Sequence, residues 1–255
     1  MQIDRLSLRG FRNYEDAQAQ FVPGVNLLVG GNANGKTNLL EAVSYLSTGR
    51  SFRTRREAEL IRFGADFAEL RAQVQSQERT RELRAVLFSG RRPRQLWLAG
   101  VKQRSRAALS GVLTSVLFCP EDLMILKKGA SGRRRLMDGV ICQLRPNYEA
   151  ALTEYGRLLD QKSALLRERY DNPSLLQVLP EYDLRMAQTG ALVISYRARY
   201  VKALAQEAAR YHREFSGDSE TLELTYRTVS TVTDPFAPPE TLCAQLQEHQ
   251  RSHAR

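Results

Sequence analysis

Apolar and polar positions alternate near the start of the chain. The alternation covers residues 3–8, and an apolar pair follows a polar stretch at 21–22. Residues 25–29 are a short, nearly continuous apolar run behind Pro23-Gly24. Alternation is typical of half-buried strands, whereas a continuous apolar run bounded by turn residues is typical of a buried strand. We therefore expect strands at all three places, the third one buried.

The period changes to that of a helix after Gly35. Apolar residues recur at 39, 40, 43, 45 and 46, and Gly49 ends the pattern, which predicts one amphipathic helix. From 67 to 98 alternating runs follow one another, with a turn-like Ser89-Gly90 before the last of them. Consecutive alternating runs joined by turns predict an antiparallel meander.

The second half of the chain is helical in composition. Before it, a strand candidate at 114–119 is closed by Pro120, which cannot donate to a sheet. Long helical stretches then cover 131–170, with an interruption at Pro146, and 181–215. These stretches predict a helical hairpin.

The chain ends with weaker signals. Alternation returns at 221–229 and predicts a strand, and 240–249 predicts a last helix. Together these patterns predict two parts, a lobe at 1–130 and a mainly helical lobe with a terminal strand and helix at 131–255.

One segment carries an explicit chemical motif. It satisfies the pattern G-x-x-x-x-G-K-[ST] between the predicted strand at 25–29 and the predicted helix, the context that a P-loop requires. Its residues are Gly30, Gly31, Asn32, Ala33, Asn34, Gly35, Lys36 and Thr37. In such a loop, backbone N–H groups at a helix N-terminus cradle phosphates, the lysine reaches the β- and γ-phosphates, and the threonine hydroxyl binds Mg²⁺. The motif predicts ATP and Mg²⁺ as ligands, and its alternative is a glycine-rich turn before a capped helix.

Composition and charge narrow the partners. The chain has 38 Lys and Arg against 28 Asp and Glu, a formal charge of +10, which favours polyanions such as nucleic acid. Its three cysteines form no CxxC pair, so neither a disulfide framework nor a zinc site is indicated. The N-terminus has no signal-peptide pattern, and no stretch approaches the roughly twenty apolar residues of a membrane span. We expect a cytoplasmic protein without membrane contact.

The sequence around the motif resembles the RecF family of DNA repair and replication proteins. Five blocks in the order of that family carry the resemblance, over residues 1 to about 215. They are Phe11-Arg12-Asn13-Tyr14, Thr37-Asn38-Leu39-Leu40-Glu41-Ala42, Gly49-Arg50-Ser51-Phe52-Arg53, Cys119-Pro120-Glu121-Asp122-Leu123, and the run from Arg133-Arg134-Arg135 to Lys162-Ser163-Ala164-Leu165-Leu166. The family is related to the SMC ATPases.

The resemblance implies an α/β fold, a P-loop ABC-ATPase head with a mixed or antiparallel sheet around the P-loop helix and an inserted, mainly helical lobe. It also implies ATP sandwiched in a head-to-head homodimer, binding to single-stranded or gapped DNA, support of SOS induction, and a RecR-type recombination mediator as partner. Arg12 and Asn13 match family positions near the nucleotide. The resemblance therefore implies that both contact ATP, with solvation at a strand end as the alternative.

Arginine clusters are candidates for DNA contact. The candidates are Arg53, Arg55 and Arg56 after the predicted P-loop helix, and Arg91, Arg92 and Arg94 at the predicted hairpin turn. Guanidinium groups at a protruding turn suit a phosphate backbone, and a solvated basic loop is the alternative. For the run 133–135, ion pairing between lobes is the favoured interpretation. Aromatic residues do not interleave with these runs in sequence, which indicates backbone contact rather than base stacking.

Hydrolysis of ATP is not predicted for this chain. The apolar run 115–119 ahead of Glu121-Asp122 imitates a Walker B strand, but Pro120 argues against it, and the resemblance implies the position of a Q-loop. The signature motif and the paired acids that the family carries toward its C-terminus do not appear before Arg255, so we expect a truncated head. Such a head lacks the groups that position the attacking water.

Two other function classes fit parts of the sequence. A small-molecule or nucleotide kinase shares the P-loop, and the helical hairpin would then be its lid. A non-hydrolysing module would bind DNA or a partner without turnover.

Overall fold

The computed structural model describes residues 1–76, 79–125, 127, 129–169 and 172–253. The chain divides into two compact units, one of Met1–Arg133 with Cys142–Pro146 and another of Arg134–Ile141 with Asn147–Arg255. Helix α2 (Ala130–Leu144) contributes residues to both units. The boundary between the units therefore runs through a helix, whereas the sequence patterns place the change at residue 131.

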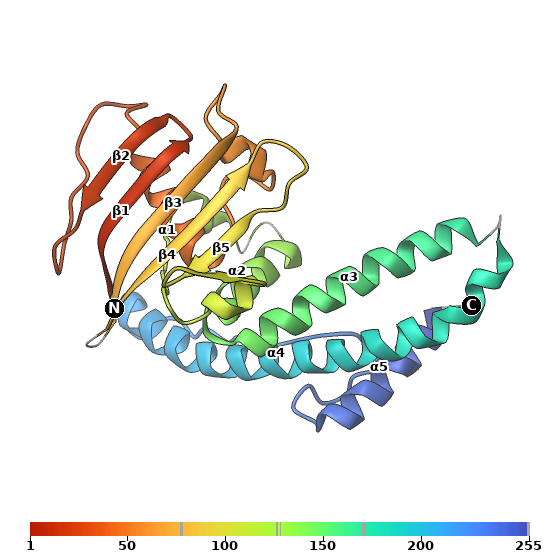
Figure 1. Ribbon diagram of the computed structural model, residues 1–255. Coiled ribbons are helices and arrows are strands. Elements are labelled where there is room, and N and C mark those ends of the chain that lie inside the picture. The colour runs from red at the N-terminus through yellow and green to blue at the C-terminus, as the bar shows by residue number, and fades with distance from the viewer. Residues whose placement is uncertain (77–78, 126, 128, 170–171, 254–255) are drawn as a thin grey trace. The chain divides into compact units, whose positions relative to one another are not determined.

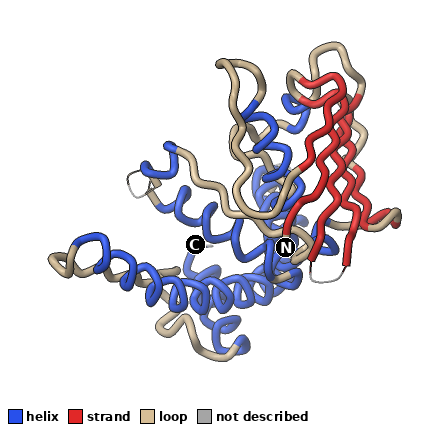
Figure 2. Tube along the Cα trace, turned by 90° about the vertical axis from the view of Figure 1, so that its left-hand side faces the viewer, coloured by secondary structure: helices blue, strands red, loops and turns tan. Residues whose placement is uncertain are grey.

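The first unit is built on one antiparallel sheet of six strands, drawn as arrows in Figure 1 and in red in Figure 2. The strand order is β2-β1-β3-β4-β5-β6, and each neighbouring pair is antiparallel. The strands are β1 (Gln2–Phe11), β2 (Tyr14–Gln20), β3 (Phe67–Ser76), β4 (Arg79–Phe88), β5 (Gln95–Leu98) and β6 (Val101–Gln103). The first predicted strand and the meander predicted over 67–98 are confirmed.

The core of this unit lies between one face of the sheet and helix α1 (Lys36–Thr48). Leu8, Leu70 and Ala85, on β1, β3 and β4, are buried on this face. Ala42 and Tyr45 of α1 belong to the same core. Residues two apart share one face of a strand, which is why alternation in the sequence located these strands. Burial of the apolar side of α1 holds the P-loop helix on the sheet.

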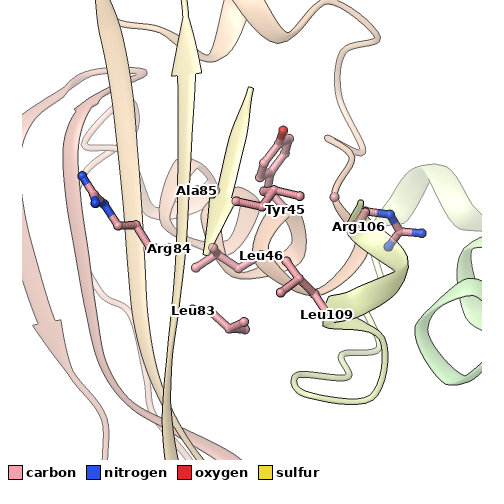
Figure 3. Close-up of a pocket in the computed structure, with 9 residues that line it drawn as sticks. Tyr45, Leu46, Leu83, Arg84, Ala85, Arg106 and Leu109 are labelled. Atoms are coloured by element: carbon pink, nitrogen blue, oxygen red, sulfur yellow. The ribbon is translucent and has the colours of Figure 1, made fainter. Parts of the chain in front are cut away.

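Gly49 ends α1, as the sequence predicted. Its φ is 64°, and its N–H donates to the carbonyl oxygen of Tyr45 at 2.7 Å, a left-handed helix end that favours glycine. A Cβ at this position would come 1.9 Å from Cδ of Arg106, which begins the helical turn η2 (Arg106–Leu109). Figure 3 shows this corner, where Tyr45 and Leu109 line a small pocket. Gly49 is therefore favoured by its backbone angle, and a larger residue there would also displace the Arg106 side chain.

The predicted buried strand at 25–29 is wrong. This segment belongs to no strand, and Val25, Leu27 and Val29 are 92%, 83% and 82% exposed. A strand needs a neighbour that pairs its backbone and covers its side chains. The described residues place no strand beside this segment, so the apolar run forms a loop between β2 and the P-loop.

Other strand predictions fail for related reasons. The residues 114–119 form no strand, and Val116 is 98% exposed. Residues 221–229 are also irregular, and Tyr226 and Val229 pack against the helical core of the second unit instead of in a sheet. The strand expected at 21–22 lies earlier, at β2. That strand is an edge strand with mainly polar residues, so it carries no apolar alternation.

The second unit is helical. After α2 come α3 (Pro146–Glu168), the helical turn η4 (Pro173–Val178), α4 (Leu179–Ser216) and α5 (Pro239–His253), so the predicted hairpin and last helix are confirmed. Asp138, Tyr148 and Arg197 join α2, α3 and α4. Tyr148 donates its hydroxyl hydrogen bond to Asp138, and Nη2 of Arg197 lies 2.9 Å from Oδ2 of Asp138. Within the described residues, no helix is long and apolar enough to cross a membrane.

Candidate nucleotide-binding site

The P-loop leads directly into α1. Gly35 caps the helix with a φ of 91°, and the N–H of Leu39 donates to the Gly35 carbonyl oxygen at 3.0 Å, which closes the first turn. The backbone N–H groups ahead of Leu39 therefore have no helical acceptor. Gly30 and Ala33 also have positive φ, at 155° and 67°, so the loop curls. Unpaired N–H groups and the helix dipole make this end of α1 suited to an anion.

The Lys36 side chain lies over the loop. Its Nζ is 2.7 Å from the carbonyl oxygen of Gly30 and 2.7 Å from that of Gly31. Residues 30–34 are exposed, and so is Thr37 in the first turn of α1. A cation, exposed backbone and a hydroxyl oxygen thus gather at one helix N-terminus, which is the donor set that a triphosphate with Mg²⁺ requires.

The β1–β2 hairpin turn holds the P-loop from the side. The turn is Arg12-Asn13, and Arg12 has a φ of 54°, as tight two-residue turns require. Oδ1 of Asn13 accepts a hydrogen bond from Nδ2 of Asn38 at 2.8 Å. The hydroxyl of Tyr14 donates to the Gly35 carbonyl oxygen at 3.1 Å, and burial raises the pKa of this tyrosine. The turn therefore contacts both the last glycine of the loop and the first turn of α1.

Glu41 is a buried charge at the centre of this arrangement. Its side chain is fully buried, and Nε and Nη2 of Arg12 donate to its two carboxylate oxygens at 2.9 and 2.7 Å. The Ser51 hydroxyl also donates to it, and Nη1 of Arg53 lies 3.4 Å away. Burial alone would raise the pKa of Glu41, but the hydrogen bonds and charges of these partners outweigh it, and the pKa lies below its ordinary value. The carboxylate is therefore held ionised.

The structure brings Arg12 and Asn13 to the P-loop helix, as expected of residues near a nucleotide. Their contact with ATP itself stays a prediction, because the guanidinium of Arg12 already donates to Glu41 and to the backbone of Glu59. The role of Glu41 was missed. Its signal in the sequence is a single acid on the otherwise apolar side of a predicted helix, beside Ala42 and Tyr45.

One arginine of the first cluster, Arg53, contacts residues of this site. Nη1 of Arg53 donates to Oδ1 of Asn38 at 2.7 Å, so the loop after α1 is tied to the first turn of the same helix. Arg55 and Arg56 are exposed, as a DNA contact requires. The helical turn η1 (Glu57–Leu60) follows them.

The second cluster is divided. Arg91 and Arg92 are exposed in the loop between β4 and β5. Arg94 points inward instead, where it donates to the Gly49 carbonyl oxygen at 2.8 Å and forms an ion pair with Glu57. The exposed cations of this loop are therefore Arg91 and Arg92, while the charge of Arg94 links the loop to the end of α1.

The acids at 121–122 do not follow a strand. Asp122 accepts a hydrogen bond from the N–H of Cys119 at 2.9 Å and so caps the helical turn η3 (Pro120–Met124). The side chain of Glu121 lies outside the described residues. The visible role of Asp122 is therefore local, as the proline before it indicated.

Comparisons with known proteins agree with this arrangement. Residues 2–92 match the family described as the RecF/RecN/SMC N terminal domain. A DNA replication and repair protein RecF of Symbiobacterium thermophilum is 40% identical over 97% of this chain and 65% of its own length. Another, of Synechococcus sp. (strain JA-2-3B'a(2-13)), is 38% identical over 100% of this chain and 67% of its own length. The chain thus spans about two thirds of the length of these relatives.

Solved structures are similar over nearly the whole chain. One is described as the recombination mediator protein RecF-ATPrS in the RecFOR pathway, with a TM-score of 0.90 and 28% identity over 98% of this chain and 67% of that one. Another, described as RecF-ATP, has a TM-score of 0.85 at the same identity and coverage. The α/β head with a helical lobe is therefore the fold of these RecF structures.

Proposed function

The chain belongs to the RecF family of DNA replication and repair proteins, and from that premise we propose that it is the ATP-binding part of a DNA clamp in recombinational repair. The observation that carries this proposal is the P-loop itself. A loop with positive φ values, an ammonium group above it and an exposed hydroxyl meet at the N-terminus of α1. This is the chemistry that recognises a triphosphate.

We assign the ATP site to the loop from Gly30 to Thr37. Its backbone N–H groups would hold the phosphates, and Lys36 would exchange its two carbonyl contacts for phosphate oxygens. The hydroxyl of Thr37 would bind Mg²⁺, which neutralises the charge of the β- and γ-phosphates when bound. Arg12 and Asn13 complete the proposed site from the β1–β2 turn.

We also propose the family's wider partners for the whole protein. These are single-stranded or gapped DNA, a second copy of the head across ATP, and a RecR-type mediator, in a pathway that supports SOS induction. The net charge of +10 and the exposed Arg55, Arg56, Arg91 and Arg92 support DNA as a ligand. The chain spans 65% of a relative's length, so these partners are proposed for the whole protein.

The test is whether ATP controls DNA binding. The chain should bind a labelled gapped oligonucleotide more tightly with MgATP than without it, and Lys36→Ala should remove that difference. Lys202→Ala is the control, because it removes an exposed lysine of α4 far along the chain from the loop. An unchanged ATP effect in Lys36→Ala contradicts the mechanism. Consumption of ATP with a small acceptor and no effect of DNA would instead favour the kinase.

A further inference from the structure

The sheet has a second face, opposite α1, that carries arginine and aromatic side chains. On β4, Leu83 and Ala85 point to the core, so Arg84 between them points to the other face. Figure 3 shows the Arg84 side chain on the opposite side of the sheet from Tyr45 and Leu109. We call this surface the outer face of the sheet.

Strand register arranges the outer face into a row. Paired residues on neighbouring strands lie about 5 Å apart, so a row across six strands is about 24 Å long. From β2 to β6 in sheet order, the successive partners in this row are Gln18, Ser7, Arg71, Arg84, Trp97 and Lys102. Cationic, aromatic and amide side chains therefore stand in one line, although they are far apart in sequence.

Cations lie over aromatic rings at three places on this face. Cζ of Arg84 is 4.4 Å from the ring centre of Trp97. The other pairs are Arg9 over Phe67 at 5.6 Å and Arg92 over Phe88 at 4.3 Å, and the two phenylalanines are partners in the β3–β4 register. Each pair places a guanidinium over an aromatic ring, and both groups are flat surfaces on which another ring can stack.

The outer face carries more cations than acids, and its acids are Asp16, Glu69 and Glu82. Exposed cations on it include Arg5, Arg9, Arg71 and Lys102. Glu69 lies among them with 13% of its side chain exposed, pairs with Arg71 at 2.9 Å and also contacts Arg84. Its carboxylate neutralises one of these two charges and fixes both guanidinium groups in place, which lowers the entropy that a ligand must remove on binding.

We propose that the outer face of the sheet binds single-stranded nucleic acid. Bases stack on the aromatic and guanidinium planes around Trp97, and phosphates contact the exposed Arg71 and Lys102. A single strand is the ligand because stacking requires base faces that a duplex hides. The inference rests on the proposed function in taking DNA as the ligand, but it adds a surface separate from the arginines of the loop after α1, and that surface includes Arg92 of the loop after β4.

The chain carries its own reporter for this proposal. Trp97 is its single tryptophan, so a change of tryptophan emission on titration comes from the outer face. We expect quenching by an oligothymidylate single strand and much weaker quenching by a duplex of the same length. Equal quenching by the duplex would overturn the assignment to unpaired bases. If polyglutamate displaced the oligothymidylate and the nucleic acid caused no quenching of Trp97, an acidic protein partner would be favoured. That result would also overturn the proposal.

Substitutions separate stacking from charge. Trp97→Leu should weaken binding of a labelled oligothymidylate about tenfold, within the range for one stacked base, with no change in salt dependence. Trp97→Phe keeps a ring and should restore most of the affinity. Arg71→Gln with Lys102→Gln should reduce the slope of log affinity against log salt by about 1.4, the value for two phosphates of a single strand. Arg251→Gln, an exposed arginine of α5, is the control for charge.

Circular dichroism and thermal unfolding identify any variant that fails to fold. If Trp97→Leu does not fold, the double variant Arg71→Gln with Lys102→Gln still tests the proposal. Folded variants that bind the single strand as tightly as the native chain, while the chain still binds DNA, would overturn this inference alone. Failure of the native chain to bind any DNA would overturn the proposed function as well.

Discussion

The packing around the P-loop depends on a missing Cβ at Gly35. Its φ of 91° is almost that of Gly24, at 89°, in the exposed loop ahead of the P-loop. At Gly24 no atom lies within 4 Å of an added Cβ, whereas at Gly35 the Cβ would come 2.7 Å from the Asn13 amide and 2.9 Å from the Tyr14 hydroxyl. A substituted residue would therefore meet similar backbone strain at both positions, but only at Gly35 would its Cβ meet close neighbours.

This pair of glycines gives a matched prediction. Gly24→Ala should cost about 1–2 kcal/mol of unfolding free energy through strain alone and leave ATP affinity unchanged. Gly35→Ala should cost more and weaken ATP binding by about tenfold, or about 1.4 kcal/mol, because the Asn13 and Tyr14 side chains must move away from the loop. Denaturant unfolding and calorimetry measure the two quantities. An equal loss of ATP affinity in both variants would mean that the contact with Asn13 is irrelevant.

Glu41 makes stability depend on pH. Its pKa in the folded chain lies below the ordinary value of 4.5, so the folded state binds fewer protons than the unfolded chain just below that pH. The stabilisation is complete above pH 4.5 and disappears as the pH falls through the lowered pKa. We predict that Glu41→Gln loses about 2 kcal/mol at neutral pH, less than for a fully buried pair because Arg12 and Arg53 reach solvent.

The measurement is urea unfolding of both proteins across this pH range. The difference between native chain and Glu41→Gln should shrink as the pH falls below 4.5. Glu15→Gln is the control, because Glu15 also pairs with an arginine, Arg62 at 3.3 Å, but its carboxylate is 83% exposed. This substitution should change the unfolding free energy little at any pH. A difference that stays constant through acid would contradict an ionised Glu41.

Among the elements, the segment at 25–29 and strand β3 make a contrast. Both carry apolar residues that predict a strand, but Leu27 is 83% exposed and Leu70 is fully buried. We predict that Leu27→Ala changes the unfolding free energy by less than about 0.5 kcal/mol, and that Leu70→Ala costs about 2–5 kcal/mol. Denaturant unfolding checks both. A large loss in Leu27→Ala would show that this segment is packed in the chain.

The same elements explain what sequence reasoning achieved. β1, β3, β4 and the helices were predictable because each buries one face against a partner and so carries a period of two or of 3.6. β2 was misplaced to 21–22, because an edge strand with polar side chains lacks that period. The segment at 25–29 was misassigned, because an apolar run is compatible with a buried strand but does not show whether a neighbouring strand exists to pair with it.

The candidate site divides in the same way. The P-loop was predictable because its residues are contiguous and each has a chemical role. The ion pair of Arg12 with Glu41 joins residues 29 positions apart, and the outer face joins Trp97 to arginines of two other strands. Such sites arise from strand register and side-chain packing between distant residues, and a local pattern in the sequence does not predict these contacts.

At the scale of the whole molecule, the first unit contains every part that the proposed ATP site uses. The loop, α1 and the β1–β2 turn all lie within residues 1–133 of this unit. Clamp closure, the mediator and turnover are proposals for the whole protein, and the chain spans about two thirds of the relatives' length. ATP binding is therefore the claim on which the proposed clamp depends.

Calorimetric titration of the chain with MgATP tests that claim most directly. We predict one site per chain, loss of binding in Lys36→Ala, and native affinity in Lys202→Ala. The absence of binding by the folded native chain, or equal affinity in Lys36→Ala, would contradict the assignment of the loop from Gly30 to Thr37.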